Sequence, residues 1–194
     1  GGPEGTLAAL DKRTGAVVWR SKEVTDQAAY TSPVVAEMDG VRQCIALTNQ
    51  GVVGVGAEDG RVLWNYRRKF STEVVNTPIV EGSLVYVTVG AGQGCDLIRI
   101  ERSGEAFNVA VVYTNKNMTN HHGNTVLVNE HVFGFSEGKG WICQPLVSGE
   151  IAWSERRKLP AGALTYADGR LYCYSENDGT AVLIEADTTA WKEA

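Results

Sequence analysis

The chain repeats one short turn segment about every 45 residues, and this period constrains its fold more than any other feature. Four segments share a turn glycine: ALDKRTGAVVW (9–19), GAEDGRVLW (56–64), RIERSGEAFN (99–108) and PLVSGEIAW (145–153). The spacings between Gly15, Gly60, Gly104 and Gly149 are 45, 44 and 45 residues. A second marker, TSPVV at 31–35 and NTPIV at 76–80, keeps the same spacing of 45. Two independent markers on one period indicate a structural repeat.

A tryptophan follows the turn glycine by four residues in three of the four copies, at Trp19, Trp64 and Trp153. Asn108 takes that place in the third copy. The tryptophan lies on the outer strand of its hairpin, and we expect its large ring to pack between neighbouring repeats.

Each repeat has the composition of β-strands joined by tight turns. The stretch at 82–90, GSLVYVTVG, is apolar on both faces, which suits an inner strand of a buried sheet. The stretches at 131–137 and 169–176 are rich in aromatic and β-branched residues. Glycine in the turns between them supplies the positive φ that a hairpin needs. No segment shows a helical period over 11 residues or more.

Repeated four-stranded units of this length are typical of a β-propeller. We therefore predict an all-β fold, a β-propeller of four-stranded antiparallel blades, with residues 1–194 as a single propeller segment. The predicted blades are a partial blade at 1–22, whole blades at 23–67, 68–112 and 113–156, and a partial blade at 157–194. Because both ends then lie inside a blade, we expect a partial propeller, whose open edges the remaining blades of a longer chain or a partner would close.

Composition excludes several functional classes. Lys and Arg number 18 against 23 Asp and Glu, a net charge of −5 that disfavours nucleic-acid binding. No apolar run reaches the roughly 18 residues of a membrane span. The four cysteines form no C-x-x-C pair, so we expect buried reduced thiols on strands, with a disulfide as the alternative: Cys44, Cys95, Cys143 and Cys173.

The segment A-x-D-x-x-T-G-x-x-x-W at residues 9–19 resembles the repeat of the PQQ-like β-propellers. That superfamily includes the quinoprotein alcohol dehydrogenases and the propeller lipoprotein of outer-membrane protein assembly. The stretches at 115–124 and 164–186 are similar to uncharacterised bacterial members. The resemblance implies a structural role for the repeat residues, with Asp and Thr tying the turn and Trp joining neighbouring blades. These residues are Asp11, Thr14, Gly15, Trp19, Asp59, Gly60, Trp64, Gly104, Gly149 and Trp153.

We expect a non-catalytic scaffold that binds a protein or a small molecule on the funnel face of the propeller, without a cofactor or a metal. The resemblance implies a bacterial protein that is exported to the periplasm or cell envelope. The alternative is a PQQ-dependent dehydrogenase whose site residues lie mostly outside this chain. Such enzymes carry adjacent cysteines, which this chain lacks, and calcium held by Glu, Asn and Asp. Glu137, Asn177 and Asp178 are present, but a calcium ion needs six to eight oxygen ligands.

Four residues are candidates for ligand binding. His121 and His122, followed by Asn124, stand between two expected strands, where propeller loops reach a face. They could line the axial funnel as polar contacts or a general base; alternatively, their side chains bond neighbouring backbone. Trp141 follows a glycine-rich turn and could stack on a sugar or a peptide; alternatively, it packs between blades.

Overall fold

The computed structural model describes residues 2–194, which form strands and turns and contain no helix. By contacts the chain divides into two compact units, Gly1–Val85 with Ile98–Val111 and Tyr86–Leu97 with Val112–Ala194. The first unit holds β1 (Ala8–Leu10), β2 (Val17–Arg20), β3 (Val34–Met38), β4 (Val41–Thr48), β5 (Gly51–Gly56), β6 (Val62–Arg67) and β7 (Ile79–Glu81). Three strands contribute to both units: β8 (Leu84–Val89), β9 (Gly94–Ser103) and β10 (Ala106–Asn115). The second unit holds β11 (Thr125–Val128), β12 (His131–Ser136), β13 (Gly140–Pro145), β14 (Trp153–Glu155), β15 (Gly162–Ala167), β16 (Arg170–Ser175) and β17 (Ala181–Glu185).

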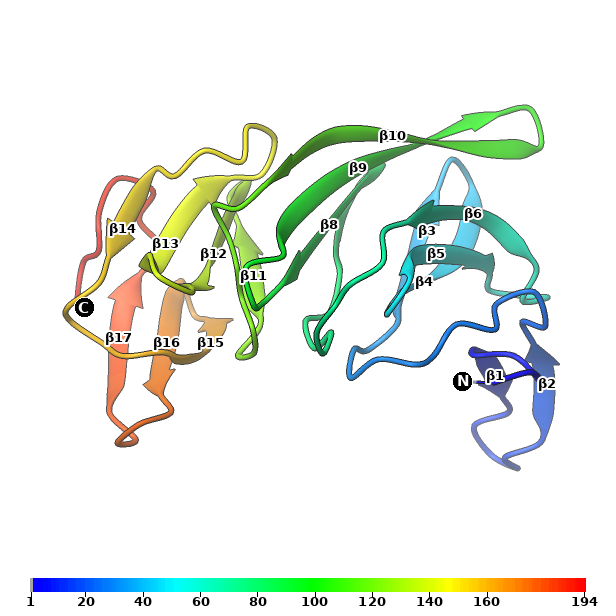
Figure 1. Cartoon of the computed structure of the whole chain (residues 1–194), viewed down its shortest axis with the longest axis horizontal. Coiled ribbons are helices and arrows are strands. Elements are labelled where there is room, and N and C mark those ends of the chain that lie inside the picture. Colours follow the sequence, from blue (N-terminus) through cyan, green and yellow to red (C-terminus); the bar gives the residue numbers. More distant parts are fainter. Residues whose placement is uncertain (1) are drawn as a thin grey trace. The chain divides into compact units, whose positions relative to one another are not determined.

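The strands of each sheet lie side by side in chain order (Figure 1). Three sheets have four strands each, in the orders β3-β4-β5-β6, β10-β9-β8-β7 and β11-β12-β13-β14. A two-stranded sheet, β1-β2, precedes them, and a three-stranded sheet, β15-β16-β17, follows. The predicted all-β fold built from four-stranded antiparallel propeller blades is confirmed. Among residues 2–194 no helix is present that could cross a membrane.

The repeat turn is held by its aspartate. Asp11 Oδ1 accepts hydrogen bonds from the backbone N–H of Thr14 at 2.8 Å and of Arg13 at 3.0 Å, and from the Thr14 hydroxyl at 2.9 Å. These bonds, those of Thr14 foremost, lower the pKa of Asp11 below its usual value. Gly15 follows with a φ of +74°, a conformation that favours glycine.

Trp19 connects the β1-β2 hairpin to the next sheet. Its Nε1 donates to the carbonyl of Ala57 at 2.9 Å, in the turn between β5 and β6. Its ring lies so close to Gly60 that a Cβ atom at Gly60 would overlap it. The ring also packs against the buried cluster of Val24, Ala46, Val53 and Val55. The aromatic residue of one hairpin therefore covers the turn glycine of the following sheet.

The second unit repeats the hydrogen bond twice and the glycine contact once. Tyr113 donates its hydroxyl to the carbonyl of Leu146 at 2.9 Å, and a Cβ atom at Gly149 would overlap its ring. Trp153 donates its Nε1 to the carbonyl of Asp187 at 2.8 Å. Both rings thus extend from the outer strand of one sheet to a turn that belongs to the next sheet.

Tyr113, rather than Asn108, corresponds to the repeat tryptophan in the third copy. In three sheets the third strand begins with a glycine that lies against a backbone carbonyl of the outer strand. Gly51 faces the carbonyl of Tyr66, Gly94 that of Asn115 and Gly140 that of Glu155. Two residues before these carbonyls lie Trp64, Tyr113 and Trp153. The β9-β10 hairpin has ten residues in each strand, against six in β5 and in β6. Because the strands of this hairpin are longer, the residue four positions after the turn glycine is Asn108, which is exposed and is not the equivalent of the repeat tryptophan.

Trp64 differs from the other repeat aromatics. Its Nε1 donates to Gln43 Oε1 at 2.6 Å, and its ring lies over Gly54, the residue opposite it on β5. Both contacts lie in its own sheet. A hydrogen bond to a neighbouring sheet is therefore seen for Trp19 and Trp153, whereas the Nε1 of Trp64 bonds within its own sheet.

The contact between Trp19 and Gly60 can be tested by comparison with Gly15. Gly15 and Gly60 have φ values of +74° and +72°, but only Gly60 has a ring beside it. We expect Gly15→Ala to cost about 1 kcal/mol from backbone strain. Gly60→Ala should cost about 1–3 kcal/mol more, because the added methyl collides with Trp19. Urea unfolding measures both losses, and equal losses would show that the ring contact contributes nothing.

Candidate functional site

His121 and His122 lie at the end of a loop that connects β10 to β11. The loop residues before them, Met118, Thr119 and Asn120, are buried, with at most 4% of their surface exposed. His121 and His122 themselves are exposed. The two imidazoles thus stand on a loop that is anchored in the protein interior.

Three hydrogen bonds anchor this loop to the neighbouring strands. The Thr88 hydroxyl donates to the carbonyl of Met118 at 3.0 Å and accepts from the N–H of Asn120 at 3.2 Å. The Asn120 side-chain amide donates to the carbonyl of Phe135 at 2.8 Å. A Cβ atom at Gly90 would overlap the Cα of His121, so glycine at the end of β8 permits the close approach of the loop.

A cavity of about 140 Å³ lies beside the two histidines. It is lined by His121, His122, Phe135, Glu137, Ala161, Gly162 and Glu176. The His122 Nε2 contacts a carboxylate oxygen of Glu176, and the His121 ring meets the His122 ring edge-on at a centroid distance of 5.2 Å. A second carboxylate, that of Glu137, accepts the N–H of Gly92 at 3.4 Å.

The cavity combines two imidazoles with two carboxylates. Its volume admits a group of a few heavy atoms, such as the end of a polar side chain. The carboxylates accept hydrogen bonds, and each imidazole can donate or accept according to its tautomer. The arrangement therefore suits a ligand group that offers hydrogen-bond donors or positive charge.

The other two candidates lie elsewhere. Asn124 is exposed, follows Gly123 and has a φ of +64°, but it does not line the cavity. Trp141 is only 2% exposed. Its Nε1 donates to the carbonyls of Leu159 and Pro160 at 3.0 and 3.1 Å, and its ring packs against Phe135 and Trp191. These contacts are the ones expected if Trp141 packs between blades and does not stack on a ligand.

The two glutamates of the cavity were not singled out together by the sequence patterns. Each directly follows an aromatic residue and a serine at the end of a sheet's second strand, in Phe135-Ser136-Glu137 and Tyr174-Ser175-Glu176. This repeated aromatic-Ser-Glu triplet was a usable signal. A loop that crosses from the preceding sheet is what brings the histidines to them.

The two carboxylates of this chain that the dehydrogenase alternative could use lie in separate turns. Asp178 Oδ1 accepts the N–H of Thr180 at 3.0 Å in the turn between β16 and β17, and this bond, first among several, lowers the pKa of Asp178. Glu137 lies in a different turn, between β12 and β13. Within residues 2–194 no three His, Cys, Asp or Glu side chains are grouped so that they could hold a metal ion.

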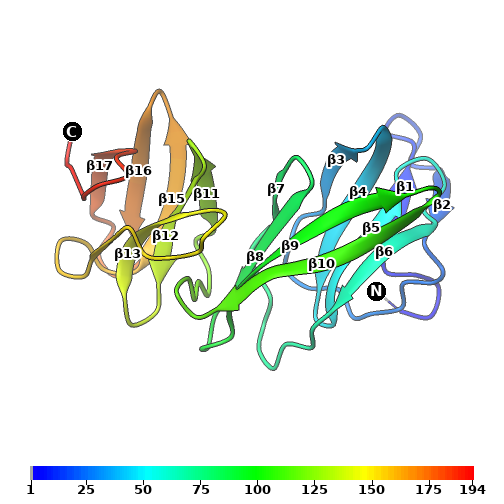
Figure 2. The same ribbon diagram turned by 90° about the horizontal axis from the view of Figure 1, so that it is seen from above.

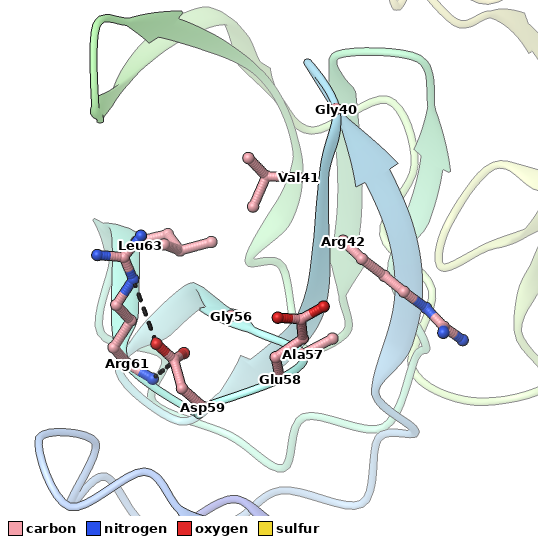
Figure 3. A pocket seen from close by; sticks show the side chains of 9 residues that line it. All are labelled: Gly40, Val41, Arg42, Gly56, Ala57, Glu58, Asp59, Arg61 and Leu63. Carbon is pink, nitrogen blue, oxygen red and sulfur yellow. Dashed lines mark hydrogen bonds and ion pairs between the residues drawn. The ribbon is translucent and has the colours of Figure 1, made fainter.

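A second, larger cavity of about 250 Å³ lies in the first unit, between the β3-β4 turn and the β5-β6 turn (Figure 3). Asp59 and Arg61 form an ion pair at 3.5 Å on one side, and the side chains of Val41 and Leu63 face the cavity. The paired charges are largely exposed, so their net electrostatic contribution is small.

The four cysteines are free thiols, and three of them are buried. Burial raises the pKa of Cys173 to about 12. Burial, and to a smaller degree the Asp187 carboxylate, raises the pKa of Cys143 to about 12. Cys44 is the one cysteine of the four that is partly exposed.

We expect Cys44, the one partly exposed thiol, to be the first to react with an aromatic disulfide reagent at pH 8, although burial raises its pKa as well. Cys95, Cys143 and Cys173 should react only after unfolding, because burial both shields them and disfavours the thiolate. The matched control is Cys44→Ser, which should remove the fast phase. Fewer than four reactive thiols in the denatured, unreduced protein would instead indicate a disulfide.

The chain shares its fold with known propeller proteins. A family model described as "Outer membrane protein assembly factor BamB" matches residues 3–106. BamB from Moraxella catarrhalis is 19% identical with a TM-score of 0.67, and the match covers 99% of this chain and 59% of that one. The computationally designed Ika4 protein is 11% identical with a TM-score of 0.63, covering 88% and 98% of the two chains.

A europium-containing methanol dehydrogenase is 11% identical with a TM-score of 0.52, covering 96% of this chain and 50% of that one. At these identities the structural likeness establishes the fold alone. The chain spans 59% of the length of the Moraxella protein. Comparison with curated protein sequences gives no match.

Proposed function

The chain belongs to the family of the outer membrane protein assembly factor BamB, and from this we propose that it is a non-catalytic scaffold that binds another protein. One observation carries the proposal. The β15-β16-β17 sheet packs one face into the protein core and leaves two tyrosines of its other face exposed. Tyr172 and Tyr174, both on β16, are 47% and 55% exposed. Paired aromatic rings on a strand are typical of protein contact surfaces.

The same strand position is covered in the preceding blades. Tyr172 is the third residue of a six-residue second strand, as are Tyr86 on β8 and Phe133 on β12. Tyr86 and Phe133 are each 1% exposed. Gln144 on β13 donates to the Tyr86 hydroxyl at 3.2 Å, and Phe133 packs in the cluster that contains Leu164, Leu171 and Cys173. The position of Tyr172 is therefore one that the following sheet covers.

What fits this face is the flat, apolar surface of a β-sheet, either of a further blade of the parent protein or of another protein. Tyr172 and Tyr174 would bury their rings against it, while the phenol hydroxyls keep polar partners at the margin. The exposed side chains of Ala163 and Thr165 on the neighbouring strand β15 are small, so a partner can approach closely. The cavity beside His121 and His122 is a second, smaller contact, for a polar group of a protein or a small molecule. A location in the periplasm or cell envelope accords with the family and is part of the proposal.

Site-specific photocrosslinking in bacterial cells tests the scaffold. A photoreactive phenylalanine at position 174, in the parent protein, should give one crosslinked product whose mass exceeds that of the parent by that of a partner. The matched control is position 65, where Asn65 is exposed on β6. The same products at both positions would contradict specific binding. A crosslink within the parent protein would assign the face to another of its blades and remove the support for partner binding.

The dehydrogenase alternative is tested by titrating the parent protein with PQQ and calcium while tryptophan fluorescence and alcohol-dependent dye reduction are followed. We expect neither saturable quenching at tens of micromolar PQQ nor dye reduction, because Glu137 and Asp178 bond backbone N–H groups in two separate turns. Saturable quenching together with alcohol-dependent reduction would replace the scaffold by a quinoprotein enzyme. A quinone-binding protein of known activity is the positive control.

A further inference from the structure

Strand β10 is an open sheet edge of unusual length and composition. It is the outermost strand of the β10-β9-β8-β7 sheet, and among residues 2–194 it pairs only with β9. Figure 2 shows β9 and β10 running side by side as two long strands. The ten residues of β10, AFNVAVVYTN, include no charged residue, no proline and no glycine. Such an edge offers unpaired backbone donors and acceptors to another strand.

The outer strands of the other sheets differ from β10 in length and in charge. β2 has four residues and ends in Arg20, β6 has six and ends in Arg67, and β14 has three and ends in Glu155. Short length and charged residues are the means by which proteins prevent unwanted strand pairing. The chain carries these features on its other outer strands and lacks them on β10.

Four of the first six residues of β10 are exposed, and the segment is held in place by the other face. Ala106, Asn108 and Ala110 are exposed, and Val111 is 53% exposed. Phe107 is buried on the opposite face, with the Arg102 guanidinium 5.9 Å from its ring centre.

Arg102 also fastens the hairpin to the β3-β4 turn. Its side chain donates to the carbonyl of Asp39 at 2.9 Å, and its backbone N–H donates to Asp39 Oδ2 at 3.2 Å. The edge is therefore ordered before a partner arrives, which reduces the entropy lost on binding.

We propose that residues 106–111 of β10 bind an extended, uncharged segment of a partner protein, which adds to the sheet as a further strand. The inference rests on the proposed scaffold function and names the kind of partner. Backbone hydrogen bonds supply the affinity, and the small side chains of Ala106 and Ala110 let the added strand approach. An uncharged segment fits better than a second copy of this chain, because two copies of net charge −5 repel each other.

The test uses a fluorescein-labelled eight-residue peptide that alternates threonine and valine, titrated into the full chain by fluorescence anisotropy. Ala110→Lys places a charge on the β10 edge, and Asn65→Lys places the same charge on an exposed position of β6. We expect Ala110→Lys to weaken peptide binding about tenfold or more and Asn65→Lys to leave it unchanged. Amide hydrogen exchange within residues 106–111 should slow when the peptide binds.

Other outcomes overturn the inference in distinguishable ways. Equal binding by both variants, or no slowing of exchange in β10, would show that the peptide binds elsewhere. A dimer that Ala110→Lys dissociates, detected by light scattering, would assign the edge to a second copy of the chain. If the peptide does not bind while a partner still crosslinks at position 174, the scaffold remains supported and the β10 inference fails. If crosslinking at position 174 also fails, the proposed function fails with it.

Discussion

An aromatic side chain that bonds a turn of the next sheet is the interaction on which the rest of the structure depends. Trp19, Tyr113 and Trp153 each place a ring on an outer strand and donate a hydrogen bond to a carbonyl in the following sheet. A single antiparallel sheet of this size is not stable alone, so each must bury a face against a neighbour. The ring supplies buried area, and its single polar atom selects the turn that it contacts.

Rigid contacts between the sheets position the candidate binding surfaces. The loop that carries His121 and His122 crosses from one blade to the next, and its buried residues Met118 and Asn120 bond Thr88 and Phe135 on two different sheets. The exposed rings of Tyr172 and Tyr174 stand on a sheet whose other face is tightly packed. Buried residues of the core therefore support both surfaces.

Polar groups in the turns hold the backbone, whereas those beside the cavity are exposed to solvent. Asp11 and Asp178 have lowered pKa values because each accepts backbone hydrogen bonds within a turn. Their folded-state pKa values lie below the unfolded ones, so their contribution to stability is present near neutral pH and is lost as the pH falls through the folded pKa. Glu176 contacts an exposed imidazole at a cavity, where a ligand group can reach both.

The sequence by itself determined the all-β propeller fold, because the turn glycines repeat on one period with strand-forming stretches between them, and both signals depend only on local geometry. It also placed Asp11 and Gly15 in a repeat turn and Trp19 on the strand that follows. Only the tertiary structure decided that Tyr113 replaces the third tryptophan, because a hairpin with longer strands moves the turn glycine away from the aromatic position. The burial of Trp141 and the meeting of His122 with Glu176 were likewise decided in three dimensions, since both depend on packing between sheets whose residues are distant in the chain.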